Sequence, residues 1–341
     1  MHQVLYYLLN ERKRMRNKFC VIFVFVLCLF GSYTFACTVF MSTDGQLTFF
    51  GNNEDGPLET AVMKFIPASK KEYGRFFFEL IDNPNPLIRK YPQGGMNDQG
   101  LAFDITATPL KKPQELIIPE NTPYCQGNLM KTVLAKAATV EEAIEIIKKY
   151  KASEIIRKKY NQSEFRQIQV FLADKTGDSA VIGIGKNNRL TVTRKYGRFQ
   201  VLANFNIANY ENSLISERYR YDTATEMLKQ NKPLTIKYFR KILSAVHTEG
   251  LAATIYSTIY NLNQGKIYLY NFHDYENVVE MNLQNELNKG KHSFKISSRF
   301  PRKVFAEIAT KEFSAKFYKL YKLLEKYKKQ VEYCKKYHQN Q

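Results

Sequence analysis

A cysteine stands directly after a segment that has the features of a secretion signal, and this junction offers the clearest chemistry in the sequence. The junction reads SYTFA–CTVF, and Cys37 is the first residue after it. A cut at this point leaves a thiol and a free α-amine on the same residue. An α-amine has a pKa of about 7.7–8.0, so it can take the thiol proton and later return it to a leaving group. The junction therefore predicts an N-terminal cysteine nucleophile.

Such a nucleophile needs three supports: a group that holds the amine, donors for an oxyanion, and a cation or dipole that favours the thiolate. The run GNNEDG follows Cys37 across a predicted hairpin, so Asp55 and Asn52 can return to the start of the first strand. Asn204 ends a strand in VLANFN and is a candidate oxyanion donor, while Arg218 lies at a helix start in SERYRYD. Taken singly, each has an ordinary alternative: a turn, a strand-end cap and a surface helix residue.

The elements that must position these residues are grouped as strands and helices in turn. The patterns predict strands at 37–43, 46–53, 61–67, 74–81 and 94–109, a helical block at 127–160, strands at 168–185 and 190–206, helices at 211–230 and 235–250, and a hairpin at 252–272. The run TVEE, starting at Thr139, predicts a capping box within the first helical block. This grouping favours an α+β layered domain over a parallel sheet with alternating helices.

Five fragments in order resemble one known family over roughly residues 37–287. They are the CT start, GNNED, MNDQGLAFD, VLAN and ERY, and the hairpin TIYSTIYNLNQGKIYLYNF is also similar to the family's penultimate hairpin. The chain resembles the choloylglycine hydrolase and penicillin V acylase group of N-terminal nucleophile (Ntn) hydrolases, which are linear amide C–N hydrolases. It also resembles the branch of the acyl-coenzyme A:6-aminopenicillanic acid acyltransferases.

The resemblance implies a four-layer αββα sandwich in which two antiparallel sheets lie between helical layers. It implies that Cys37 is the nucleophile, that its amine is the base, and that Asp55 orients the amine. It further implies that Asn204 contributes to the oxyanion hole and that Arg218 supports the cysteine electrostatically.

The sequence departs from the family pattern at two places. Asn52 stands where the bile-salt enzymes have an arginine, so one cation next to the thiol is missing. The second asparagine of the family aligns near Ala107, and Asp104 is a candidate substitute polar group. These departures concern the identity of the substrate more than the type of reaction.

Residues 1–36 are predicted to be a signal peptide, with Met15 as an alternative start. NERKRMRNK is a positive segment, FCVIFVFVLCLFG is apolar, and Thr34 and Ala36 are small residues before the cut. We therefore expect an exported protein, periplasmic or secreted. An uncleaved N-terminal anchor and a lipoprotein are alternatives, and either leaves the protein associated with a membrane.

Residues 37–296 are predicted to be the catalytic domain and residues 297–341 a basic amphipathic helical tail. Of the formal net charge of +19, residues 1–36 carry +4 and residues 302–341 carry +7, so nucleic-acid binding is not expected of the body. The apolar seam within 305–334 fits packing on its own domain, attachment to a membrane surface, or self-association, and a homo-oligomer is one outcome.

Three cysteines remain after the predicted cut: Cys37, Cys125 and Cys334. Their number and spacing fit neither a disulfide framework nor a zinc site, and we expect no cofactor and no metal. The predicted function is hydrolysis of a linear amide of a small N-acyl compound through a thioester on Cys37. One alternative is an acyltransferase, and another is a membrane-tethered binding protein whose catalytic site has decayed.

Overall fold

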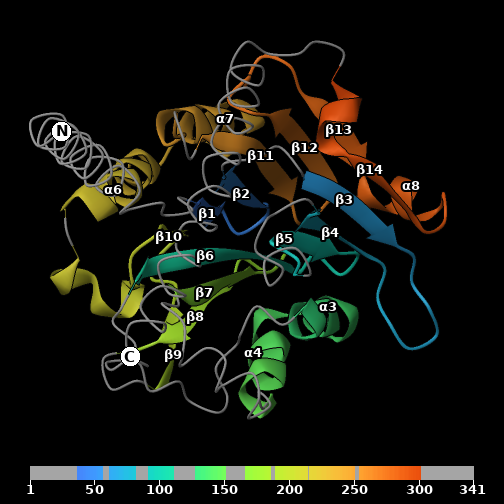
Figure 1. Cartoon of the computed structure of the whole chain (residues 1–341), viewed down its shortest axis with the longest axis horizontal. Helices are drawn as coiled ribbons and strands as arrows, with labels where there is room; N and C mark the ends of the chain where they lie inside the picture. The colour runs from blue at the N-terminus through green and yellow to red at the C-terminus, as the bar shows by residue number, and fades with distance from the viewer. Residues whose placement is uncertain are drawn as a thin grey trace, which may run out of the picture. The chain divides into compact units, whose positions relative to one another are not determined.

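The stretches rich in β-branched and aromatic residues form strands, and these strands pair into two antiparallel sheets (Figure 1). The computed structural model describes residues 37–56, 61–81, 91–110, 127–150, 166–185, 189–213, 215–249 and 253–300. All of them belong to one unit of the chain. The predicted signal peptide, Cys125 and the predicted tail beyond residue 300 lie outside the described residues.

The first sheet has six strands in the order β10–β1–β2–β11–β12–β13. Its strands are β1 (Thr38–Thr43), β2 (Thr48–Asp55), β10 (Phe199–Leu202), β11 (Thr254–Asn261), β12 (Lys266–Asn271) and β13 (Val279–Asn282). The hairpin of β1 and β2 therefore lies in the interior of the sheet, because β10 and β11 flank it.

The second sheet has eight strands in the order β14–β3–β4–β5–β6–β7–β8–β9. Its strands are β3 (Ala61–Ile66), β4 (Arg75–Leu80), β5 (Gly94–Asn97), β6 (Ala102–Leu110), β7 (Arg166–Ala173), β8 (Ser179–Ile184), β9 (Leu190–Arg194) and β14 (His292–Lys295). Each pairs with its neighbour in antiparallel register.

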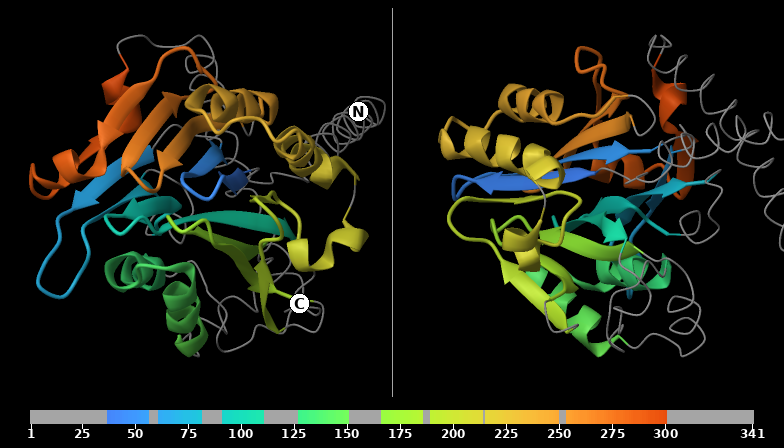
Figure 2. Two further views of the ribbon diagram at one scale, coloured as in Figure 1. Left: turned by 180° about the vertical axis from the view of Figure 1, so that it is seen from behind. Right: turned by 60° about the vertical axis from the view of Figure 1, so that its left-hand side comes forward.

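Helices cover the outer face of each sheet, which gives four layers (Figures 1 and 2). The helices are α3 (Gly127–Lys136), α4 (Val140–Lys149), α6 (Ile215–Lys229), α7 (Ile236–Ala245) and α8 (Leu283–Leu287), with 3₁₀ turns η2 (Ile207–Asn212) and η4 (Ile296–Arg299). Helices α6 and α7 pack on the first sheet, and α3 and α4 pack on the second. The predicted αββα sandwich is confirmed.

Three apolar clusters hold the layers together. The cluster between the sheets, here called the inter-sheet layer, includes Phe50 from the first sheet and Phe171 from the second, whose ring centroids are 5.6 Å apart. A second cluster lies between α3, α4 and the second sheet, and a third lies between α6, α7 and the first sheet. Alternate residues of each strand therefore enter different clusters, as the two-residue period of a strand requires.

Local sequence signals explain several of the boundaries. The turn between β1 and β2 is closed by Asp44, whose carboxylate accepts hydrogen bonds from the backbone of Gln46 and Leu47, while Gly45 adopts a φ of 91°. Helix α4 begins after Thr139, whose side chain accepts a hydrogen bond from the backbone N–H of Glu142, as the capping motif predicts.

The structure of segment 279–295 differs from the prediction, in which the last strand of the domain ends at residue 272. It forms two short strands, β13 and β14, and the short helix α8. Within the part of the chain that the structure describes, no helix has both the length and the apolar character that crossing a bilayer requires.

Candidate active site

The open end of the β1–β2 hairpin brings two of the predicted residues, Cys37 and Asp55, together. Thr38 of β1 pairs with Asn53 of β2, so Cys37 lies beside the last two residues of β2, Glu54 and Asp55. The turn at the other end fixes this register, because a slip of one residue would exchange the two faces of the hairpin. The hairpin predicted from the sequence therefore does return Asp55 to the start of the first strand.

The two faces of the hairpin contain different groups. Cys37 alternates with Val39 and Met41, which both belong to the inter-sheet layer, and its thiol contacts Glu54 from the same face. Thr38 and Asp55 point the other way, toward α6, where both contact one arginine. The thiol and the Asp55 carboxyl thus lie on opposite sides of the same sheet.

The Cys37 thiol is buried, with 3% of its residue surface exposed. Its Sγ atom lies 3.5 Å from Oε2 of Glu54 and donates a hydrogen bond to that carboxylate. Burial raises the pKa of the thiol well above its ordinary value, and the nearby carboxyls of Glu54, Asp55 and Asp104 raise it further. A hydrogen bond from the backbone of Asp55 acts in the opposite direction and favours the thiolate.

Two adjacent carboxyls at the end of β2 are both held in water-poor surroundings. Burial, assisted by the charge of Asp55, raises the pKa of Glu54 to about 8. Burial also raises the pKa of Asp55 to about 7, although the Arg220 guanidinium and the Thr254 hydroxyl both favour its charged form. Either carboxyl can therefore change its proton occupancy near neutral pH.

Arg220 of α6 joins three parts of the site. Its guanidinium donates hydrogen bonds to the Thr38 hydroxyl at 2.8 Å, to Asp55 Oδ2 at 3.4 Å and to Asn204 Oδ1 at 2.8 Å. The other oxygen of Asp55 accepts a hydrogen bond from Thr254 of β11. One guanidinium thus ties the start of β1, the end of β2 and the residue after β10 into a single network, which also sets the position of Cys37.

Arg218, the arginine predicted to support the cysteine, lies outside this network. Its guanidinium stacks over the ring of Tyr210, with 4.6 Å between the guanidinium carbon and the ring centroid. Arg218 and Arg220 are two residues apart on α6, which places them about 200° apart around the helix axis, so that only one can face the sheet. The position expected for Arg218 is occupied by Arg220.

Asn204 lies at the predicted place but already has two hydrogen-bond partners. It follows β10, its Oδ1 accepts from Arg220, and its Nδ2 donates to the backbone oxygen of Ala107 at 2.8 Å. The amide therefore links the first sheet to β6 of the second. The sequence predicts that Asn204 donates to an oxyanion. In the structure its Nδ2 group donates to the backbone of β6.

Asn52 and Asp104 both enter the inter-sheet layer and are fully buried. Asn52 Oδ1 accepts a hydrogen bond of 2.5 Å from the Thr258 hydroxyl, and its Nδ2 has no partner among the described residues. No side chain in the described part of the chain donates a hydrogen bond to either carboxyl oxygen of Asp104. Burial raises the pKa of Asp104 well above its ordinary value, and Glu54 raises it further.

One protein-family model matches the sequence over most of the strands and helices described above. The model of the acyl-coenzyme A:6-aminopenicillanic acid acyl-transferases matches residues 41–274. The chain belongs to this family. A search of the curated proteins by sequence gave no significant match.

Solved structures share the fold of this acyl-transferase family member. Two variants of conjugated bile acid hydrolase from Clostridium perfringens match with TM-scores of 0.57 and 0.54, at 17% sequence identity, over 76% of this chain and 96% of theirs. Penicillin V acylase from Agrobacterium tumefaciens matches with a TM-score of 0.45 at 13% identity, over 76% of this chain and 91% of that one. The two bile acid hydrolase structures show that the sandwich described above is the Ntn-hydrolase fold.

Several polar residues near the thiol are not among those predicted from the sequence. The main one is Glu54, which lies in the motif GNNED next to the predicted Asp55. Tyr256 and Tyr260 of β11 are also buried in the inter-sheet layer. Strand alternation from Cys37 and Asn52 was the available signal for Glu54, since residues 52 and 54 of one strand share a face.

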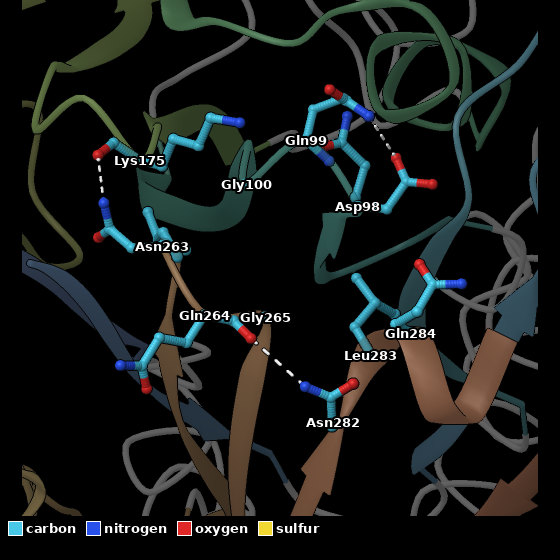
Figure 3. Close-up of a pocket in the computed structure, with 12 residues that line it drawn as sticks. Asp98, Gln99, Gly100, Lys175, Asn263, Gln264, Gly265, Asn282, Leu283 and Gln284 are labelled. Atoms are coloured by element: carbon cyan, nitrogen blue, oxygen red, sulfur yellow. Dashed lines mark hydrogen bonds between the residues drawn. The ribbon is translucent and has the colours of Figure 1, made fainter.

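A hollow lies at the end of the sandwich away from Cys37, where the loops of both sheets meet (Figure 3). It has a volume of about 180 Å³ and is lined mainly by amide side chains and loop backbone. Asn263 joins it to the turn end of the hairpin by accepting a hydrogen bond from the backbone of Thr48 and donating one to the carbonyl of Lys175. The length of β1 places it roughly 20 Å from Cys37, so it is separate from the thiol site.

The described residues contain no group of three or more His, Cys, Asp and Glu side chains placed to hold a metal ion.

The replacement Glu54→Gln is expected to move the alkylation of Cys37 to lower pH. The wild-type carboxylate lies 3.5 Å from Sγ and disfavours the thiolate, so its neutral isostere lowers the pKa of the thiol. The measurement is the rate of iodoacetamide labelling at Cys37, followed by mass spectrometry across a pH series. Glu276→Gln, in which the side chain is 84% exposed, is the control and should leave the profile unchanged. An unchanged or upward-shifted profile in Glu54→Gln contradicts the expectation.

Proposed function

We propose that the protein is an exported amidase that becomes active when its chain begins at Cys37. It cleaves the C–N bond of a linear, non-peptide amide in a small N-acyl compound and forms a thioester on Cys37. The proposal includes the removal of residues 1–36, because this step releases the α-amine that serves as the general base. The family match and the shared Ntn-hydrolase fold support it.

One observation carries most of the weight. The residue that sequence signals mark as a mature N-terminus is also the one whose thiol enters the inter-sheet layer beside acidic and amide side chains. Directly behind it, Arg220 joins Asp55, Thr38 and Asn204 in one network. A chance cysteine at a cleavage site has no need of such a frame.

The proposed reaction has two halves. The Cys37 thiol gives its proton to the α-amine, and the sulfur attacks the amide carbonyl. The C–N bond then breaks, and the departing amine takes the proton from the α-ammonium. In the second half the α-amine removes a proton from water, the hydroxide attacks the thioester, and the free acid leaves while the thiol is restored.

The oxyanion formed in each half needs hydrogen-bond donors. We assign this role to the side-chain amides of Asn204 and Asn52, together with backbone N–H groups. Asn52 supports the assignment because its Nδ2 is buried in the same layer as Cys37 and has no partner among the described residues. Asp55 and Arg220 act behind the strand, where they hold the first residues of β1 in place.

A second candidate reaction is transfer of the acyl group to an amine instead of water. The family description favours it, since the matching model is that of an acyl-transferase. Both reactions pass through the same thioester and differ only in the second nucleophile. The residues described above serve either reaction without change.

The decisive experiment combines a mass measurement with a product analysis. The intact mass of the protein after export tests whether residue 37 is the first residue and whether it is unmodified. The same sample is then incubated with N-acyl amides of different chain length, with and without an added amine, and the products are separated by chromatography.

Free acid as the main product in both cases supports the amidase, and a new amide that forms only with the added amine supports the transferase. A chain that still carries residues 1–36, or a processed chain that yields neither product and resists an acyl-electrophile probe at Cys37, overturns the proposal. The second of these results indicates the decayed binding protein.

A further inference from the structure

Two buried carboxyls from opposite sheets lie on the same side of the hairpin as the nucleophile. Glu54 belongs to β2 and Asp104 to β6, and both side chains enter the inter-sheet layer. Strand β6 passes next to β1 and β2 in Figure 1, and β1 packs against β6. Gly94 of β5 pairs with Asp104, and a Cβ atom at this glycine would lie 2.4 Å from Asp104 Oδ2. The missing side chain at Gly94 therefore leaves the space that the Asp104 carboxyl occupies.

Polar atoms that lack partners gather around these carboxyls. Among the described residues, no side chain donates a hydrogen bond to either oxygen of Asp104, and the hydroxyls of Thr106 and Tyr256 make no hydrogen bond. All three residues are fully buried. Burial raises the pKa values of Tyr256 and Tyr260, and the nearby carboxyls of Glu54 and Asp104 raise them further. Buried polar groups in native proteins are almost always paired, so a cluster of unpaired ones marks a place where a ligand completes the pairing.

The described inter-sheet layer offers these carboxyls no cation. Arg75 is the one lysine or arginine among the buried described residues, and its guanidinium is bound to Glu72 beside β4. Arg220 lies on the other face of the first sheet, where it contacts Asp55. A buried carboxylate is costly unless a positive charge accompanies it. The two carboxyls, with the tyrosine hydroxyls, are therefore suited to a positive group that arrives with the ligand.

We propose that the substrate carries a protonated amine close to the scissile amide, and that Glu54 and Asp104 bind this ammonium group between the sheets. The inference rests on the proposed function in that Cys37 is the attacking group. Sγ attacks at about 3.2 Å, Sγ lies 3.5 Å from Glu54 Oε2, and a charged hydrogen bond measures about 2.8 Å. An ammonium bound to Glu54 therefore lies no more than roughly 9.5 Å from the scissile carbonyl. Amides of short diamines, acylated on one nitrogen, meet this requirement.

The bound ammonium also affects the nucleophile. The Glu54 carboxylate, 3.5 Å from Sγ, opposes formation of the thiolate. An ammonium group bound to Glu54 neutralises this negative charge and so favours the thiolate. The cationic substrate therefore promotes ionisation of the thiol that attacks it. The preference for cationic substrates should therefore appear in kcat as well as in KM.

The test uses three octanoyl amides that differ only at the far end of the amine. The amines are diaminopropane, butylamine and γ-aminobutyrate, whose ends are positive, neutral and negative. We expect kcat/KM for the diaminopropane compound to exceed that for the butylamine compound by at least about tenfold, with the γ-aminobutyrate compound poorest. In Glu54→Gln and Asp104→Asn, which keep side-chain size, the ratio of cationic to neutral substrate should fall toward one. Glu276→Gln at the surface should retain the wild-type ratio.

A binding measurement separates this inference from the proposed function. Calorimetry with the Cys37→Ser protein reports whether the octanoyl diaminopropane compound binds more tightly than its neutral analogue, without any need for turnover. Selective binding without hydrolysis by the wild type keeps the inference and overturns the amidase. Hydrolysis of all three compounds at similar rates, or a cation preference that survives both carboxyl replacements, overturns the inference and leaves the amidase in place.

Discussion

Replacement of Cys37 by serine is expected to lower kcat/KM for amide cleavage on the order of a thousandfold or more. A serine hydroxyl has a much higher pKa than a thiol and is a weaker nucleophile, and the buried, acidic surroundings of this position add to the difficulty of ionising it. The fold should persist, because serine has nearly the size of cysteine and can still donate to Glu54. The measurement is steady-state hydrolysis together with the melting temperature.

The control for this variant is Cys334→Ser, which lies in the predicted tail and should retain activity. An acyl-electrophile probe should modify Cys37 stoichiometrically in this control and should fail to modify the Cys37→Ser protein. Full activity in Cys37→Ser, with normal processing at residue 37, would mean that another residue attacks the amide.

Replacement of Arg220 by alanine is expected to reduce kcat by about a hundredfold and to lower the melting temperature, whereas Arg218→Ala should change kcat by less than about threefold. Arg220 makes three hydrogen bonds within the site, to Thr38, Asp55 and Asn204. Its loss leaves the Asp55 carboxyl, which is fully buried, without its positive partner. Arg218 instead contacts the ring of Tyr210, away from this network.

The two arginine variants form a matched pair, because they remove the same group from the same helix at positions two residues apart. Arg220→Lys is a useful third variant: it keeps the charge but cannot make the three separate contacts, and it should fall between wild type and Arg220→Ala. If Arg218→Ala is the damaging change and Arg220→Ala is mild, the network described here is not the frame of the site.

Where the chain had strong local signals, the sequence was sufficient to predict the structure. The turn at Asp44 and Gly45, the cap at Thr139 and the grouping of strands and helices all gave the observed elements. The segment 279–295 was missed because its two strands have four residues each and lie at sheet edges, as the outermost strands β13 and β14. So short a run contains too few alternations to show a period.

The limits at the site have a similar physical origin. In the run RYR either arginine could face the sheet, and only the packing angle of α6 selects Arg220. Glu54 was overlooked because a carboxylate beside a thiol disfavours the thiolate, so no simple rule for nucleophiles places it there. The contact between Asn204 and Ala107 joins positions 97 residues apart, and no local pattern encodes it.

Adjacent residues of β2 serve opposite faces of the first sheet, and this affects how the protein can diverge in evolution. Glu54 and Asp55 are neighbours in the chain, yet the side chain of Glu54 enters the inter-sheet layer and that of Asp55 contacts Arg220 of α6. A substitution at position 54 can therefore change which substrates bind beside Cys37, while the contacts of Asp55 with Arg220, which hold the start of β1, stay intact. Single substitutions can therefore change the substrate specificity of this fold. Among relatives that share the same hairpin, substrate range is the property that should differ most.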